Sequence, residues 1–207
     1  MSILATQGVT PLSYQDCLLL IASMPILTKE PDIYPANLLE KPLPQGDESW
    51  YAMYTIARHE KELMRKLRPL NIAHYGPLIP QRKRSPQGRI RTSYVPLFSG
   101  YVFIRGDNEA RYQAVSTGCV SRCLLVKEIE QLADDLRRIH QLVQGGQDVR
   151  PEPKPLLGRT AMVKRGAMTG LKGTITKVHD QHRLTVIVNF MQKGASILVD
   201  EADVELL

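Results

Sequence analysis

Cysteine is scarce in this chain, which has three cysteines in 207 residues. A small, odd number of cysteines argues against a disulfide framework and favours a reduced, cytoplasmic setting. Three residues separate Cys119 from Cys123 and two separate His179 from His182, which is not the spacing of a zinc finger. We therefore expect no metal site, and a core built from the apolar residues that make up 43% of the chain.

Long apolar runs and nucleotide or hydrolase motifs are also missing. The apolar run at residues 17–27 is shorter than the ~20 residues of a membrane span. No Lys or Arg precedes Lys29, so this run lacks the positive region of a signal peptide. Neither a Walker loop nor a nucleophile elbow occurs, and the neighbouring Asp134 and Asp135 would face different directions on a helix. We expect no membrane contact, no cofactor and no enzymatic activity.

Positive charge is present and is concentrated in one part of the chain. The formal net charge is +6, and residues 51–94 hold ten Lys and Arg against only Glu60 and Glu62. Residues 1–50 have the opposite balance, with more acids than bases. Such a concentration is typical of a nucleic-acid contact. A solvated charged face is the alternative interpretation.

Proline content and hydrophobic periodicity divide the chain into four parts. Residues 1–48 end in a proline-rich, acidic stretch and are predicted to be a largely disordered leader. Residues 49–145 alternate between strand and helix patterns, residues 146–156 are a polar, proline-rich linker, and residues 157–207 hold short β segments. This predicts an α+β fold: an antiparallel sheet flanked by helices on one face, then a linker and a small five-stranded β-barrel.

Within residues 49–145 the elements can be placed individually. Amphipathic spacing predicts helices, and runs of β-branched and aromatic residues predict strands. The expected strands are 49–56, 74–81, 94–105 and 119–126, the expected helices are 57–70, 108–116 and 127–146, and residues 82–91 are expected to be a basic loop.

Two motifs resemble a known family. The segment "SWYAMYTIARHEKELMRKL", the basic loop and "PLFSGYVF" together resemble the NusG N-terminal domain of bacterial transcription elongation factors. The segment "VKRGAMTGLKGTITKV", with Gly166, Gly170 and Gly173, resembles the KOW motif. Both occur in the family's order and cover roughly residues 49–207. "SWYAMY" and "PLF" look more like the specialised paralogues, the antiterminator RfaH among them, than the general factor.

The resemblance implies a contact with the coiled coil of the RNA polymerase clamp. The matching positions are Tyr54, Phe98, Tyr101 and Phe103. Aromatic rings anchor interfaces because they bury a large area with few rotatable bonds. Alternation puts Tyr101 and Phe103 on one strand face, so these two rings have core packing as an alternative, whereas Tyr54 and Phe98 are expected at the surface.

A protein held on the clamp would bring the basic loop to upstream or non-template DNA near the transcription bubble. The cations concerned are Arg82, Lys83, Arg84, Arg89 and Arg91. Contacts with phosphates or with an exposed strand would be tolerant of sequence and sensitive to salt. Arginine can also read a guanine edge, and nothing in the loop indicates that it recognises a particular sequence.

The KOW domain is implied to recruit a ribosomal protein or the termination factor Rho. Met168, Phe190 and Met191 match partner-facing positions, with ordinary barrel core as the alternative. The RfaH C-terminal domain can refold as helices. Here the strong β preference of "RLTVIVNF" and the three glycines predict a permanent barrel.

Two functions are therefore carried forward. The first is a monomeric transcription elongation factor or antiterminator that holds the clamp closed and suppresses pausing or termination. The second is a KOW-type RNA-binding protein associated with ribosomes or translation, which would need aromatic rings exposed on the sheet face.

Overall fold

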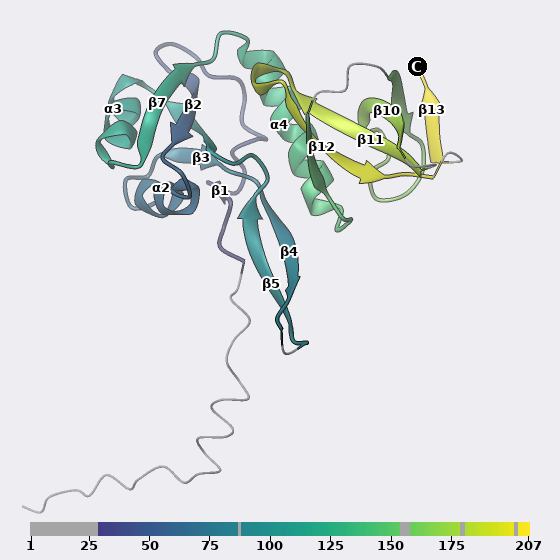
Figure 1. The fold of residues 1–207 in the computed structure, drawn as a ribbon. Coiled ribbons are helices and arrows are strands. Elements are labelled where there is room, and N and C mark those ends of the chain that lie inside the picture. The colour runs from purple at the N-terminus through teal and green to yellow at the C-terminus, as the bar shows by residue number, and fades with distance from the viewer. Residues whose placement is uncertain (1–28, 87, 154–157, 179–180, 201–202) are drawn as a thin grey trace, which may run out of the picture. The chain divides into compact units, whose positions relative to one another are not determined.

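The computed structural model describes residues 29–86, 88–153, 158–178, 181–200 and 203–207 (Figure 1). Residues Pro31–Leu207 form one compact unit, and all the helices and strands below lie within it. The greater part of the expected leader, residues 1–28, lies outside the described residues, as does His179.

Five antiparallel strands form the N-terminal sheet in the order β1-β3-β6-β2-β7. Their bounds are β1 Ile33–Tyr34, β2 Ser49–Thr55, β3 Ala73–Tyr75, β6 Tyr101–Gly106 and β7 Val120–Leu125. The strand β2 lies between β6 and β7, with Ala52 opposite Phe103 and Met53 opposite Val102 on β6. This register decides which aromatic rings of β6 face inward.

Helices cover both faces of this sheet, not one as expected from the sequence. The helices are α2 Glu60–Leu67, α3 Asn108–Ser116 and α4 Ile129–Gln144, close to the predicted ranges. Val102 and Ile104 of β6 pack with Leu63 and Met64 of α2, whereas Phe103 packs in the cluster that contains the apolar stripe of α4. Alternate residues of a strand point to opposite faces, so both faces of β6 are buried. No described helix is both long and apolar enough to cross a membrane.

The basic segment is a hairpin and not a loop. Strands β4 (Leu78–Arg84) and β5 (Ile90–Pro96) form a separate two-stranded sheet, with Lys83 opposite Arg91. Gly88 in the turn has φ +81°, which glycine adopts readily. A two-stranded ribbon leaves both outer edges unpaired, so Pro80 and Pro96 cost it no ladder hydrogen bond.

Residues 31–45, here called the N-terminal strap, are ordered and not part of a disordered leader. The strap contributes β1 to the sheet, pairing Ile33 with Tyr75 of β3. Leu38 and Leu39 are 1% and 7% exposed and belong to the same cluster as α4. Burying two leucines recovers about 3–6 kcal/mol of transfer free energy, which offsets the entropy of ordering part of this segment.

The C-terminal sheet has six antiparallel strands in the order β13-β9-β10-β11-β12-β8. Its strands are β8 Arg150–Pro153, β9 Arg159–Val163, β10 Lys172–Val178, β11 Gln181–Val188, β12 Lys193–Leu198 and β13 Val204–Leu206, with the 3-10 turn η1 Asn189–Met191 before β12. The sixth strand, β8, comes from the expected linker and pairs with β12. The order has two ends, β13 and β8, so closure into a barrel remains a prediction.

Candidate functional site

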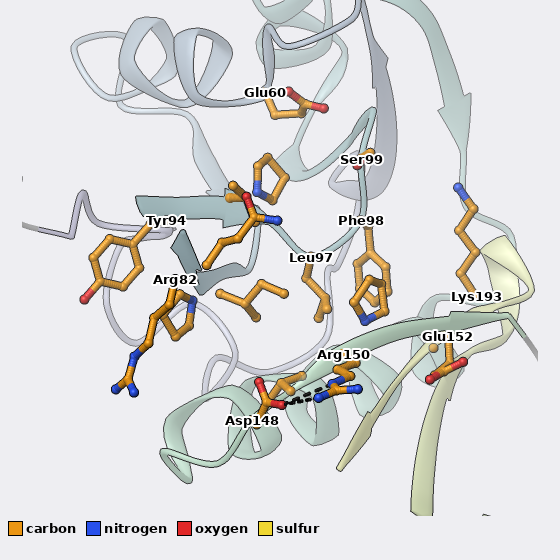
Figure 2. Close-up of a pocket in the computed structure, with 18 of the residues that line it drawn as sticks. Glu60, Arg82, Tyr94, Leu97, Phe98, Ser99, Asp148, Arg150, Glu152 and Lys193 are labelled. Atoms are coloured by element: carbon orange, nitrogen blue, oxygen red, sulfur yellow. Dashed lines mark hydrogen bonds and ion pairs between the residues drawn. The ribbon is translucent and has the colours of Figure 1, made fainter. Parts of the chain in front are cut away.

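A groove of about 1340 Å³ lies at the base of the hairpin (Figure 2). Its apolar lining includes Ile79, Val95, Leu97 and Phe98, from the hairpin strands and the turn that follows β5. Figure 2 shows Leu97 and Phe98 on one side of the groove and Arg150, Glu152 and Lys193 on the other. An apolar floor with a charged border is the usual build of a protein-binding hollow.

The carboxylates at the groove have partners within the protein. Glu60 is 6% exposed and accepts a 2.6 Å hydrogen bond from the backbone N–H of Gly100. The Asp148 carboxylate lies 2.9 Å from Arg150. Glu152 accepts a hydrogen bond from Ser196, 3.2 Å away. These bonds fix the positions of the three carboxylates at the groove.

Several cations at the groove, unlike Arg150, have no acidic partner among the residues that the structure describes. Within the described residues, Arg58, Lys61 and Arg82 form no ion pair. Arg58 has φ +66°, a left-handed conformation that is costly for a non-glycine residue, and it lies at the groove margin. The border therefore favours an acidic partner over a basic one.

Tyr54 is the most exposed of the four aromatic residues expected to contact the polymerase. Its side chain is 41% exposed, and its ring meets Tyr101 edge-on at 5.2 Å between centroids. The Lys193 ammonium lies 5.1 Å from the Tyr101 centroid, a cation–π distance. Tyr101 is half-buried and packs against the core. Tyr54 and Tyr101 thus form a small aromatic surface beside the turn at Gly100.

Gly100 is required at this turn for two reasons, which predict the effect of replacing it. Its φ is +84°, and a Cβ there would lie 3.0 Å from Cε2 of Tyr54. Gly100→Ala should lower the free energy of unfolding by about 2 kcal/mol, measured by urea denaturation. Gly118→Ala is the matched control, because Gly118 has φ +74° and a Cβ there would meet no atom within 4 Å. Equal losses in the two variants would show that the Tyr54 ring gives way freely.

Two of the expected polymerase-contacting rings are buried. Phe103 is 0% exposed and lies between the sheet and α4, because alternation along β6 turns it inward. Phe98, expected at the surface, is 2% exposed, although it lines the groove. Its side chain packs in the core cluster that contains Leu97 and Phe103. The surface expectation for Phe98 and the partner-facing expectation for Phe103 are corrected accordingly.

The expected nucleic-acid residues are brought together on the hairpin. Arg82, Lys83 and Arg84 are exposed on β4, Arg89 lies in the turn, and Arg91 is exposed on β5. No acid occurs anywhere between residues 78 and 96. Lys83 lies directly opposite Arg91, and like charges facing each other across a ladder destabilise it. A polyanion bound along the hairpin would relieve that repulsion.

The C-terminal candidates separate into one buried and two accessible residues. Met168 is 2% exposed, and its side chain fills the space beside Gly145 at the end of α4, where a Cβ would lie 2.2 Å from the Met168 methyl. Phe190 is 38% exposed on η1, and Met191 is partly buried. Met168 therefore packs within the protein, which corrects its expected partner-facing role.

A buried carboxylate links η1 to α4. Asp135 is 2% exposed and accepts hydrogen bonds from the backbone and side-chain nitrogens of Asn189, at 2.9 and 3.3 Å. Burial raises the pKa of Asp135, and the bonds from Asn189 oppose that rise. Asp135 is therefore a structural anchor that the sequence did not distinguish from Asp134. No group of three or more potential metal ligands occurs within the described part of the chain.

Sequence reasoning missed Glu60, Lys193 and the strap. The partner of Glu60 is 40 positions away, and Lys193 reaches Tyr101 from a strand 92 positions later. Local patterns carry no signal for contacts at such separations. Glu60 stood in the expected helix 57–70 as one of several charges, with nothing to mark it as buried.

Comparison with known proteins assigns the domain. Residues 48–156 match the model of the NusG family, described as "Transcription termination factor nusG". The match contains the N-terminal sheet from β2 onward, the hairpin and the helices α2, α3 and α4. The strap lies before it, and the C-terminal sheet from β9 onward lies after it. A search of curated proteins found no match.

Proposed function

Since this chain belongs to the NusG family, we propose that it is a transcription elongation factor that binds the coiled coil of the RNA polymerase clamp. Membership of the family indicates a function in transcription and RNA polymerase as the partner. The observation that supports the clamp contact is the exposed Tyr54 ring, which lies against Gly100, the neighbour in sequence of the groove residue Ser99. Phe98 lines the groove, and the Tyr101 ring packs edge-on against Tyr54.

The proposed mechanism is mechanical. A ligand that bridges the clamp and the nucleic acid binds the closed, elongating state better than the open, paused state and shifts the population towards it. Pausing is then suppressed, and termination with it, as expected of an antiterminator resembling the specialised paralogues. The hairpin cations would contact upstream or non-template DNA as the complex moves. No catalytic step by this chain is part of the proposal.

The C-terminal sheet is proposed to be a KOW domain that recruits a further partner. Its glycines Gly166 and Gly170 both have positive φ, as tight turns between strands require. Phe190 and Met191 remain as contact residues for a ribosomal protein or for Rho, since Phe190 is exposed.

The clamp contact predicts a large effect of removing one ring. Tyr54→Ala should weaken binding to purified core RNA polymerase by about 30-fold, because an aromatic anchor contributes ~2 kcal/mol or more. Tyr112→Ala is the matched control, since Tyr112 is 66% exposed on α3. Binding is measured by biolayer interferometry, and pause lifetimes by in vitro transcription.

Two results would contradict this assignment. Equal polymerase affinity of the Tyr54 and Tyr112 variants would remove the aromatic contact. Retention of ribosomal RNA without polymerase in a pull-down from lysate would favour the KOW-type RNA-binding function in translation instead.

A further inference from the structure

The N-terminal strap touches the residues from which the hairpin emerges. The backbone C=O of Asp32 accepts a 2.8 Å hydrogen bond from Gly76, and its side-chain Oδ2 accepts one of 3.2 Å from the N–H of Leu78. Leu78 is the first residue of β4. One strap residue therefore holds both sides of Pro77, immediately before the hairpin.

The second strand of the hairpin, β5, is also attached at Pro77. The N–H of Leu97 donates to the C=O of Pro77, at 2.8 Å, just after β5 ends. Gly76 is packed against α2, since a Cβ there would lie 2.8 Å from the Met64 sulfur. The hairpin is a separate two-stranded sheet, so its direction depends on the residues at its base, which also include Ile79 and Val95 packed in the core cluster.

Asp32 is a buried acid, and the strap residues next to it are bonded to the domain. Its side chain is 4% exposed, and the strap on both sides of it is anchored. The Arg68 guanidinium donates to the C=O of Pro31. On the other side, Tyr34 stacks on His74 at 5.9 Å and its hydroxyl donates to Asn71 at 2.8 Å.

The far end of the strap is anchored independently. Arg137 of α4 donates to the C=O of Leu39 at 2.8 Å, and Arg105 of β6 donates to the C=O of Pro42 at 2.6 Å. Leu38 and Leu39 are buried in the same part of the strap. The strap is thus attached to the domain at two separate places, and only the first of them bears on the hairpin.

We propose that Asp32 is a positioning residue for the basic hairpin, and that the strap fixes the direction in which the five hairpin cations point. The strap lies outside the residues that match the NusG family model, so this device is an addition to the matched domain. Its effect on DNA binding rests on the proposed function, whereas its effect on the hairpin does not.

Hydrogen exchange of the full chain, read by mass spectrometry, tests the positioning directly. Asp32→Ala leaves the N–H of Leu78 without its buried acceptor and should lower the exchange protection of β4 and β5 by about tenfold. Asp32→Asn keeps an acceptor oxygen and should restore most of the protection. Asp107→Ala is the matched control, because Asp107 accepts a 2.8 Å hydrogen bond from Ala110 at the start of α3. It should loosen α3 and leave the hairpin unchanged.

The pattern of exchange separates positioning from general stability. Loss of protection that is equal in the hairpin, α3 and β7 would overturn the proposal, as would a hairpin that exchanges as in the wild type. If Asp32→Ala does not fold, Tyr34→Ala loosens the same end of the strap from its more exposed side and should give the same hairpin-specific pattern.

The functional arm uses a 20-nucleotide single-stranded DNA and fluorescence anisotropy at one salt concentration. Asp32→Ala should bind about tenfold more weakly than wild type and Asp32→Asn nearly as well as wild type. Unchanged affinity alongside a loosened hairpin would refute the link to binding. If the wild type itself does not bind the DNA, the proposed nucleic-acid contact fails, and the exchange pattern alone decides the role of Asp32.

Discussion

Neutralising the five hairpin cations is expected to lower the affinity for single-stranded DNA on the order of a thousandfold at 0.1 M salt. Each cation that neutralises a phosphate contributes about 0.7 to the slope of log affinity against log salt, so five contribute about 3.5. The variant replaces Arg82, Lys83, Arg84, Arg89 and Arg91 by Gln. Fluorescence anisotropy over a salt series gives both the affinity and the slope.

A two-charge version of the experiment has a matched control. Lys83→Gln with Arg91→Gln removes the facing pair on the hairpin and should reduce the slope by about 1.4. Arg122→Gln with Lys127→Gln removes two charges on and beside β7 and should change it little. The double variant of Lys83 and Arg91 should also have a melting temperature no lower than that of the wild type, because it removes two like charges that face each other across the ladder. Equal changes of the salt slope in the two double variants would mean that DNA binding depends on the net charge of the protein and not on the position of the cations.

Acidification is expected to remove about 3 kcal/mol of stability through a single buried histidine. His74 is 0% exposed, its Nδ1 lies 2.8 Å from the C=O of Ile72, and its Nε2 has no hydrogen-bond partner in the structure. The pKa of His74 is lowered from 6.5 to about 4, chiefly by burial and also by the positive charge of Arg68, against the opposing effect of the Ile72 carbonyl. The folded protein therefore holds a neutral ring with its proton on Nδ1.

The sign of the pH effect follows from these two pKa values. Below pH 6.5 the unfolded chain takes up a proton that the folded chain does not, so stability falls as the pH falls. Stability is lost between about pH 6.5 and about pH 4. The difference between these two pKa values corresponds to about 3 kcal/mol of unfolding free energy. Above pH 6.5 the contribution is constant.

The measurement is urea denaturation of wild type and His74→Gln at a series of pH values. Gln can still donate to the Ile72 carbonyl, and the carboxylate titrations cancel in the difference between the two proteins. That difference should shrink by about 3 kcal/mol from pH 7 to pH 4. If the difference in unfolding free energy between wild type and His74→Gln does not change with pH, His74 takes up a proton in the folded protein as readily as in the unfolded chain.

Much of the N-terminal domain was predictable because its helices and strands carry local patterns. The apolar stripe of α4 and the run of β-forming residues in β2 are visible in the sequence and predict nearly the observed bounds, whereas the expected strand 94–105 is divided between β5 and β6. The sequence predicts a basic loop at residues 82–91 because Pro86 and Gly88 are turn residues. In the structure the turn is shorter, and the strands pair through the cations as far as Arg84 and Ile90.

The candidate site was less predictable than the fold. Alternation places Tyr101 and Phe103 on one side of β6, which is correct, but the depth to which each is buried depends on α4 and β12. Phe98 and Met168 are expected at the surface because they lie near turns. Met168 instead packs against Gly145, which is distant in sequence, and Phe98 packs into the core cluster at the groove.

By itself the sequence determined the charged segment, the order of strands and helices and the family of the first domain, since each depends on residue types at short spacing. Tertiary structure alone decided which rings remain exposed, that Asp32 and the strap hold the hairpin, and that Glu60 supports the turn at Gly100. The physical reason is that burial and hydrogen bonding bring together residues that are tens of positions apart. Such contacts cannot be predicted from the spacing of residue types along the chain.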